Sequence, residues 1–354
     1  MINFAILAIL GSVLMSCTSA PAKSEQRFKT STMKVYSTTD SFGEIQKKLE
    51  TTVVTLCNDK GDTISEQITM ADSSSIEKIL YQYDDNRRLV EKKKVDNDGK
   101  ESLLCKAVYD SKGQIVCTIS KSYYDIDYYC KDSTVYDEFG NVICNLKYDN
   151  DILYRKTVNK YDNFNNLIIQ TEYGEKGLIE RSVYSYDTNG NKEKNIKYNS
   201  NEQITEKEEY AYDEQNRVLL SIKYSFDYKF LTYDNKPWEH QIITYYNYDD
   251  GGNLIRRYSE TGMGSPVTEE IYEYNSNNQL TRLKESVLVE GIKSQTITFY
   301  NVNGDVVSVA RYDADGLPKN RKETKFNDRN LPVSFEFYES AETLTQLVEV
   351  TYEY

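Results

Sequence analysis

One segment of the chain, Tyr184–Asn191, reads Tyr-Ser-Tyr-Asp-Thr-Asn-Gly-Asn. Its second tyrosine marks a position that recurs along the chain, which we call the hub. The hubs are Cys57, Tyr83, Tyr109, Tyr136, Tyr161, Tyr186, Tyr212, Tyr248, Tyr274, Tyr300 and Phe326. Their spacing is 25 to 27 residues, except for 36 residues between Tyr212 and Tyr248. Similarity at a fixed period is the signature of a repeat protein.

Each repeat carries the residues of a tight turn. Every hub is followed by Asp or Asn, and Gly or Asn stands four places after the hub in ten of eleven copies, Arg87 being the exception. Asp or Asn at the start of a type I turn accepts backbone N–H bonds, and Gly or Asn takes the left-handed conformation that closes the loop. The sequence predicts a hairpin in which Tyr186 pairs with Lys192. It also predicts that the residue two before the hub pairs with the one eight after it.

Tyrosines recur on both sides of the hub. Tyr or Thr usually stands two places before it, and Tyr stands twelve places after it in six copies: Tyr148, Tyr173, Tyr198, Tyr224, Tyr312 and Tyr338. Side chains alternate between the faces of a strand. Strict alternation therefore predicts one face made of tyrosine and aliphatic side chains, and a second face that is largely solvated.

A second turn ends each repeat, as in Asp96–Gly99 and Asp313–Gly316. Two strands per repeat give roughly twenty-two strands, and an open sheet of that size curls or splits. We therefore expect an all-β fold: a long antiparallel β-meander of two-strand repeats of about 26 residues, forming a curled or spiral sheet. A wide closed barrel is the alternative.

The hub motif resembles the tyrosine–aspartate (YD) repeats of Rhs proteins, wall-associated proteins and teneurins, from about residue 50 to the end of the chain. The resemblance implies a spiralling β-sheet that serves as a shell or scaffold. The family also includes surface proteins linked to adhesion and carbohydrate binding. Here the repeats are longer than in that family and lack its usual Arg after the turn Gly.

The first residues resemble the export signal of a bacterial lipoprotein. The apolar run from Ile2 to Leu14 is too short to span a bilayer, and Leu14-Met15-Ser16-Cys17 resembles a lipobox. We expect a signal peptide at 1–16, then lipidated Cys17 with a tether and irregular first strands over 17–50, and the repeat array over 51–354. The expected location is the outer membrane, with the lipid as anchor and the array facing the periplasm or the cell surface.

Composition argues against several classes of function. The net charge is −13 and no basic stripe is present, so we expect no nucleic acid partner. The chain has one His, no metal-ligand cluster, no phosphate-binding loop and no nucleophile motif, so we expect no cofactor, no metal and no enzyme. Its Asp-x-Asp-Gly segments lack the remaining ligands of a calcium loop and indicate turns. The oligomeric state is left open.

Five cysteines follow Cys17: Cys57, Cys105, Cys117, Cys130 and Cys144. Disulfides are common in exported proteins. Strict alternation, however, puts all five on the tyrosine face, with Cys117 and Cys144 about 10 Å apart. We therefore expect buried free thiols.

The exception to the period suggests a binding site. About ten extra residues lie near 228–240, with the only tryptophan and the only histidine of the chain. Insertions in repeat proteins often map to the binding side, and aromatic side chains stack on sugars. The candidate ligand-binding residues are Tyr228, Tyr233, Trp238 and His240. The alternative is an extended hairpin whose Trp packs on the sheet.

The sequence therefore predicts a non-catalytic cell-envelope lipoprotein that acts as a β-repeat binding scaffold, with glycan as the preferred ligand. A protein-interaction or shell-like scaffold is the alternative, and a glycosidase is the least favoured interpretation.

Overall fold

The computed structural model describes residues 28–41, 44–72, 76–121, 128–231, 237–289, 291–340 and 342–354. These residues form twenty-four strands and no helix. The strands are β1 Thr30–Ser41, β2 Glu44–Cys57, β3 Thr63–Met70, β4 Ile76–Tyr83, β5 Leu89–Val95, β6 Glu101–Tyr109, β7 Ile115–Lys121, β8 Tyr129–Tyr136, β9 Val142–Asp149, β10 Ile152–Tyr161, β11 Leu167–Gly174, β12 Gly177–Tyr186, β13 Lys192–Asn199, β14 Ile204–Tyr212, β15 Val218–Leu231, β16 Pro237–Tyr248, β17 Leu254–Thr261, β18 Pro266–Tyr274, β19 Leu280–Val287, β20 Ser294–Tyr300, β21 Val306–Tyr312, β22 Pro318–Phe326, β23 Pro332–Glu339 and β24 Thr343–Glu353.

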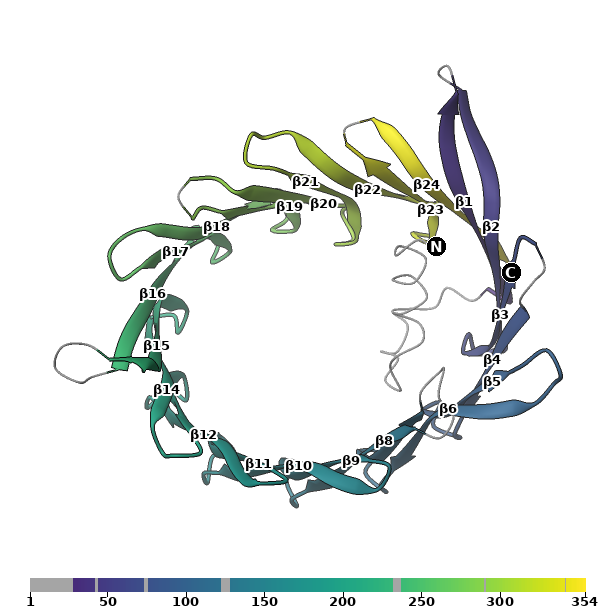
Figure 1. Cartoon of the computed structure of the whole chain (residues 1–354). Helices are drawn as coiled ribbons and strands as arrows, with labels where there is room; N and C mark the ends of the chain where they lie inside the picture. Colours follow the sequence, from purple (N-terminus) through teal and green to yellow (C-terminus); the bar gives the residue numbers. More distant parts are fainter. Residues whose placement is uncertain are drawn as a thin grey trace.

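The strands form a closed ring (Figure 1). Each strand pairs antiparallel with the next, and β1 also pairs with β24, from Thr30 opposite Glu353 to Ser37 opposite Gln346. The predicted all-β meander is confirmed, in the form of the closed barrel rather than the open spiral. Closure pairs the two strands that would be unpaired edges, prone to association, in an open meander.

The ring is larger than the predicted array. The predicted hairpins correspond to β2 through β23, and β1 and β24 are additional. Thr30–Ser41 is a paired strand with a register shift between Val35 and Tyr36, so the ring begins before residue 51, in the segment where a tether and irregular first strands were expected. At the other end, Tyr352 lies 26 residues after Phe326 and is a twelfth hub.

The predicted turns are confirmed. The residue four places after each of the eleven hubs has positive φ, and this includes Arg87 at 63° and Gly190 at 82°. In the turn after Tyr186, the Asp187 carboxylate accepts the backbone N–H groups of Asn189 and Asn191, both at 2.8 Å.

The predicted tyrosine face is wrong, because a β-bulge follows every one of these eleven turns. Tyr186 pairs with Lys192 as predicted, but Ser185 pairs with Lys194, and Tyr184 pairs with Asn195, nine places after the hub. Two residues of one strand thus lie opposite a single residue of the other. This one-residue shift reverses the faces of everything beyond it.

The tyrosines consequently divide between two faces. The hubs and the residues two before them share one, which we call the hub face. The tyrosines twelve places after the hub lie on the other, the opposite face. Five of the six are paired with a basic residue, and Tyr312 is paired with Gln295. The nitrogen of Lys207 lies 4.4 Å from the ring centre of Tyr224, and the guanidinium carbon of Arg321 lies 4.2 Å from that of Tyr338. Such cation–π pairs stabilise a sheet that has no thick apolar layer.

The same shift separates the cysteines. Cys117 and Cys144 stand eight places after their hubs and lie on the opposite face, so the expectation of a single face is wrong for them. Cys57, Cys117, Cys130 and Cys144 are half-buried free thiols, as expected. Cys105 is buried in β6, at 7% exposure.

Two hydrogen-bond ties connect successive repeats. First, a hub tyrosine donates its hydroxyl to the first carbonyl of the preceding strand, as Tyr186 does to Leu167 at 2.8 Å. Second, the side chain five places after a hub reaches the next turn, as Asn191 does to Asn216 at 2.9 Å. In the exceptional turn, Arg87 instead forms an ion pair with Asp62 of the preceding turn. These ties join the turns along one rim of the barrel, the hub rim.

A hydrophobic cluster lies where the ring closes. Val348 of β24 is fully buried and packs with Val35 of β1, which is 3% exposed. Met33, Phe335, Phe337 and Val350 pack around them. None of the residues that the structure describes forms a helix of the length and apolarity needed to cross a bilayer.

Candidate functional site

The insertion near 228–240 forms an extended hairpin. β15 pairs with β14 only as far as Ser225, and β16 pairs with β17 only from Ile242. The residues beyond these points therefore pair only within the β15–β16 hairpin, as Phe226 does with Glu239. The hairpin extends past the strands on either side of it.

The four predicted ligand residues differ in how far the structure describes them. Tyr228 is half-buried in β15, and His240 is exposed in β16 opposite Ser225. Trp238 lies opposite Asp227, and its side chain is outside the described residues. Tyr233 lies outside them entirely, as does Cys17, the predicted lipidation site. The register between β15 and β16 is interrupted between Asp227 and Leu231, so Tyr228 lies in the irregular part of the hairpin, whereas His240 lies in its regularly paired part.

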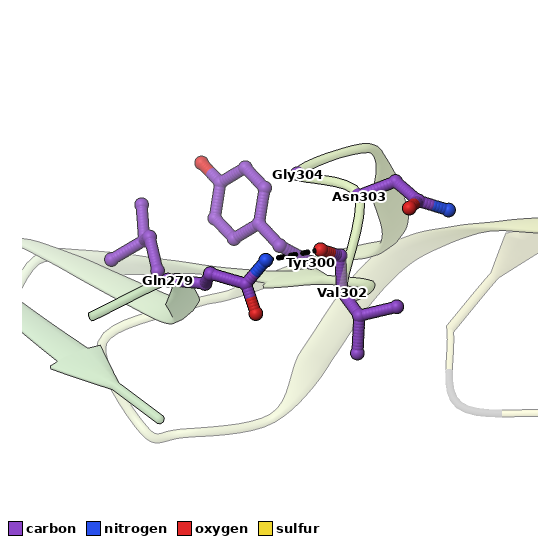
Figure 2. A pocket seen from close by; sticks show the side chains of 6 residues that line it. Gln279, Tyr300, Val302, Asn303 and Gly304 are labelled. Carbon is purple, nitrogen blue, oxygen red and sulfur yellow. Dashed lines mark hydrogen bonds between the residues drawn. The ribbon is translucent and has the colours of Figure 1, made fainter. Parts of the chain in front are cut away.

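A depression of about 550 Å³ lies at the hub rim, between the turn that follows β18 and the turn that follows β20 (Figure 2). Its lining is Gln279, Leu280, Tyr300, Val302, Asn303 and Gly304. The Gln279 Nε2 donates to the Val302 carbonyl at 2.6 Å, and Asn275 donates to the Gln279 Oε1 at 2.9 Å. No charged side chain lines this depression, so its polar groups are amides, backbone groups and one phenol.

A second depression, of about 440 Å³, lies between the turns that follow β2 and β4. Charged side chains line this depression, and two of them, Asp62 and Arg87, form an ion pair in its wall. The hydrogen bond from Arg87 lowers the pKa of the Asp62 carboxyl. Burial, with Asp62 nearby, raises the pKa of Tyr83 to about 12. The two charges neutralise one another within the wall.

A buried polar cluster lies deeper on the hub face. The Tyr81 hydroxyl donates to the Glu66 carboxylate at 2.5 Å, and the nitrogen of Lys92 lies 5.0 Å from the centre of the Tyr81 ring. Lys92 is 2% exposed. Burial raises the pKa of Glu66 and lowers that of Lys92. This cluster connects β3, β4 and β5 within the wall. Within the described ranges, no three His, Cys, Asp or Glu side chains are grouped to hold a metal ion.

Sequence reasoning missed Tyr300, Gln279 and Asn303 as a group. Tyr300 follows Tyr274 by 26 residues, the ordinary period, so nothing in the spacing distinguishes this repeat. The twelfth hub, by contrast, was detectable from its spacing.

No protein-family model and no curated protein matches the chain. Among solved structures, the Tc holotoxin pore of Photorhabdus luminescens is 11% identical, with a TM-score of 0.30 over 84% of this chain and 19% of that one. A porin-like protein from Bacteroides uniformis is 10% identical, with a TM-score of 0.27 over 92% of this chain and 98% of that one.

A second porin-like protein, from Bacteroides vulgatus, is 12% identical, with a TM-score of 0.18 over 56% of this chain and 92% of that one. The chain spans about a fifth of the length of the Tc toxin chains that it matches. TM-scores this low carry no argument about the fold or the function of this protein.

Proposed function

We propose that this protein is a non-catalytic lipoprotein of the cell envelope whose closed barrel is a rigid binding scaffold, with glycan as its ligand class. The lipid is attached at Cys17 and anchors the chain to the outer membrane. The barrel faces the periplasm or the cell surface. We also propose that the barrel, like the YD-repeat proteins that its hub motif resembles, serves as a scaffold.

The extended β15–β16 hairpin is the observation that carries this proposal. It departs from an otherwise regular period, and it brings Tyr228 and His240 beyond the neighbouring strands. Aromatic rings at an accessible edge can stack on the C–H faces of sugars, while nearby polar groups bond the hydroxyls.

Charge placement supports a barrel that stays in water. Arg256 and Glu269 form an ion pair at 2.7 Å on the opposite face, and Lys223 and Glu206 form one at 3.1 Å on the hub face. Charged side chains are costly where a strand contacts hydrocarbon. A lipid anchor that leaves the barrel in the aqueous phase agrees with ion pairs on both faces, and a closed barrel is compatible with an envelope location.

A protein-interaction or shell-like scaffold is the second candidate. The β1–β2 hairpin favours it, because Glu44–Leu49 pairs only with β1 and leaves its other edge without a partner strand among the described residues. An unpaired edge can accept an extended peptide by β-augmentation. This candidate does not require Trp238.

The test is titration of the chain from residue 18 onward, which retains every described strand. The panel contains neutral polysaccharides (glucan, mannan and xylan) and acidic ones (hyaluronan and polygalacturonate). Trp fluorescence and calorimetry report binding. We expect saturable binding of a panel member that Trp238→Phe weakens. Absence of heat with every polysaccharide would contradict glycan binding and favour the protein-interaction scaffold.

A further inference from the structure

The strands that join one repeat to the next pair in the same register throughout the ring, with one exception. In ten of the eleven strand pairs that join one hub to the next, the residue eight places after a hub pairs with the residue three places before the next hub. Lys194 opposite Glu209 and Leu220 opposite Tyr245 are examples. Between β19 and β20, however, Arg282 pairs with Phe299, which is one place before its hub. This is a slip of two residues, roughly 6–7 Å along the strand.

Tyr300 lacks the hydroxyl hydrogen bond that most hub tyrosines make; among the described residues this holds also for Tyr83, whose register is regular. Eight hub tyrosines donate their hydroxyl to the first carbonyl of the preceding strand, at 2.8 to 3.0 Å: Tyr109, Tyr136, Tyr161, Tyr186, Tyr212, Tyr248, Tyr274 and Tyr352. The corresponding carbonyl for Tyr300 is that of Leu280. The slip displaces Tyr300 by two residues relative to Leu280, and its hydroxyl bonds to none of the residues that the structure describes.

The tie between the two turns shifts by the same amount. In a regular repeat, Gln114 reaches the carbonyl of Gly140, which stands four places after its hub. The equivalent residue, Gln279, reaches the carbonyl of Val302, which stands two places after its hub. Both ties thus show the same displacement, and the depression of Figure 2 lies between them.

The geometry points to this depression as a subsite for one neutral sugar unit of a glycan. The Tyr300 ring supplies an aromatic surface, and its hydroxyl supplies a donor and an acceptor. The Asn303 side-chain amide also bonds to none of the described residues, so it is available to a ligand hydroxyl. Because no charged side chain lines the depression, an ionic ligand would find no counter-charge there. This inference rests on the proposed function and assigns it a second contact site.

The test compares two equivalent places, one at the slip and one in the preceding regular repeat. Tyr300→Phe and Asn303→Ala alter the slipped repeat, and Tyr274→Phe and Asn277→Ala alter the same positions one repeat earlier. Affinity is measured by calorimetry with glucan, mannan and xylan, and thermal midpoints are measured without polysaccharide.

We expect the Tyr300→Phe, Asn303→Ala pair to weaken neutral polysaccharide binding by about tenfold, as the loss of two hydrogen bonds implies. The control pair should leave affinity unchanged. Tyr274→Phe should lower the thermal midpoint, since its hydroxyl bonds to Leu254 at 2.9 Å, whereas Tyr300→Phe should leave it unchanged.

Three results overturn the inference, and they can be told apart. Polysaccharide binding that depends on Trp238 but not on Tyr300 and Asn303 excludes the subsite while the proposed function stands. Equal weakening by both pairs of variants assigns the effect to the rim in general and excludes a site at the slip. Absence of binding by the unmodified chain removes the proposed function and the subsite together.

Discussion

Most hub tyrosines end their own strand and also fasten the preceding repeat, Tyr300 being an exception. The Tyr186 backbone, for example, begins the turn, and the Tyr186 hydroxyl donates to the first carbonyl of the preceding strand, that of Leu167. A chain with few buried aliphatic side chains thus obtains stability from a bond repeated around the ring. This role explains why tyrosine is used at the hub, because phenylalanine would fill the same space without the bond.

We predict that Tyr186→Phe destabilises the barrel by about 1 kcal/mol, the usual net value of one such hydrogen bond. The measurement is the urea midpoint, followed by circular dichroism. Loss of the hydroxyl leaves the Leu167 carbonyl without its donor, while the ring and its packing remain.

The converse substitution is available at Phe326, whose register with the preceding strand is regular. We predict that Phe326→Tyr stabilises the barrel by up to about 1 kcal/mol, by donating to the Val306 carbonyl. An unchanged urea midpoint in both variants would show that these hydroxyls bond equally well to water.

At the scale of strands and turns, the sequence predicted the turns correctly, but it did not predict the register between strands or the face on which a side chain lies. The turn after Tyr186 was predictable, because Asp187 and Gly190 favour it without help from the rest of the chain. The face of Tyr198 was not, because the bulge that sets it arises from pairing between two strands. The slip at Tyr300 was hidden for a related reason: the number of residues between hubs is unchanged while the register differs. The same limit kept the Tyr300 depression from being predicted as a site.

The turns also determine how the barrel responds to acid. The side-chain hydrogen bond from Asn191 lowers the pKa of Asp187, and that from Asn253 lowers the pKa of Asp249. A carboxyl whose pKa is lower in the folded state stabilises the fold above its unfolded value, about 3.9. That contribution is lost as the pH falls through the folded pKa.

We therefore predict that the thermal midpoint falls as the pH drops below about 4. The variant with Asp187→Asn and Asp249→Asn should show a shallower fall, because Asn275 keeps the same backbone bonds in its own turn without a titrating group. An identical pH profile in the variant would assign acid unfolding to other carboxyl groups.

At the scale of the molecule, the ring depends on one seam. β1 and β24 lie at opposite ends of the described chain, and their pairing turns a meander into a barrel. Val348 and Val35 are buried at this seam, so a charge placed there opposes closure directly. An opened ring would present two unpaired strand edges to solvent.

We predict that Val348→Asp opens the barrel and promotes self-association through the edges of β1 and β24. Sedimentation velocity measures the association, and hydrogen exchange should show lost protection in both strands. Val306→Asp, at a position 38% exposed, is the matched control. A monomer with unchanged exchange would show that closure does not depend on this packing.

The proposed lipid anchor concerns the whole molecule as well. We predict that Cys17→Ala removes the lipid and moves the protein from the detergent phase to the aqueous phase on phase separation. Cys57→Ala, which changes a free thiol of the barrel, should stay in the detergent phase. Aqueous partitioning of the unmodified protein would contradict lipidation.

Closure by the first and last strands has a consequence for inheritance. Recombination between similar repeats adds or removes whole hairpins, and an open solenoid tolerates this because each unit contacts only its neighbours. In this ring, each hairpin gained or lost changes the circumference by about 9.5 Å, two strand spacings. The pairing of β1 with β24 must then form again in a barrel of different diameter. Selection therefore acts on repeat number as a discrete trait, and lineages that change it should do so in units of one hairpin with compensating substitutions in β1 and β24.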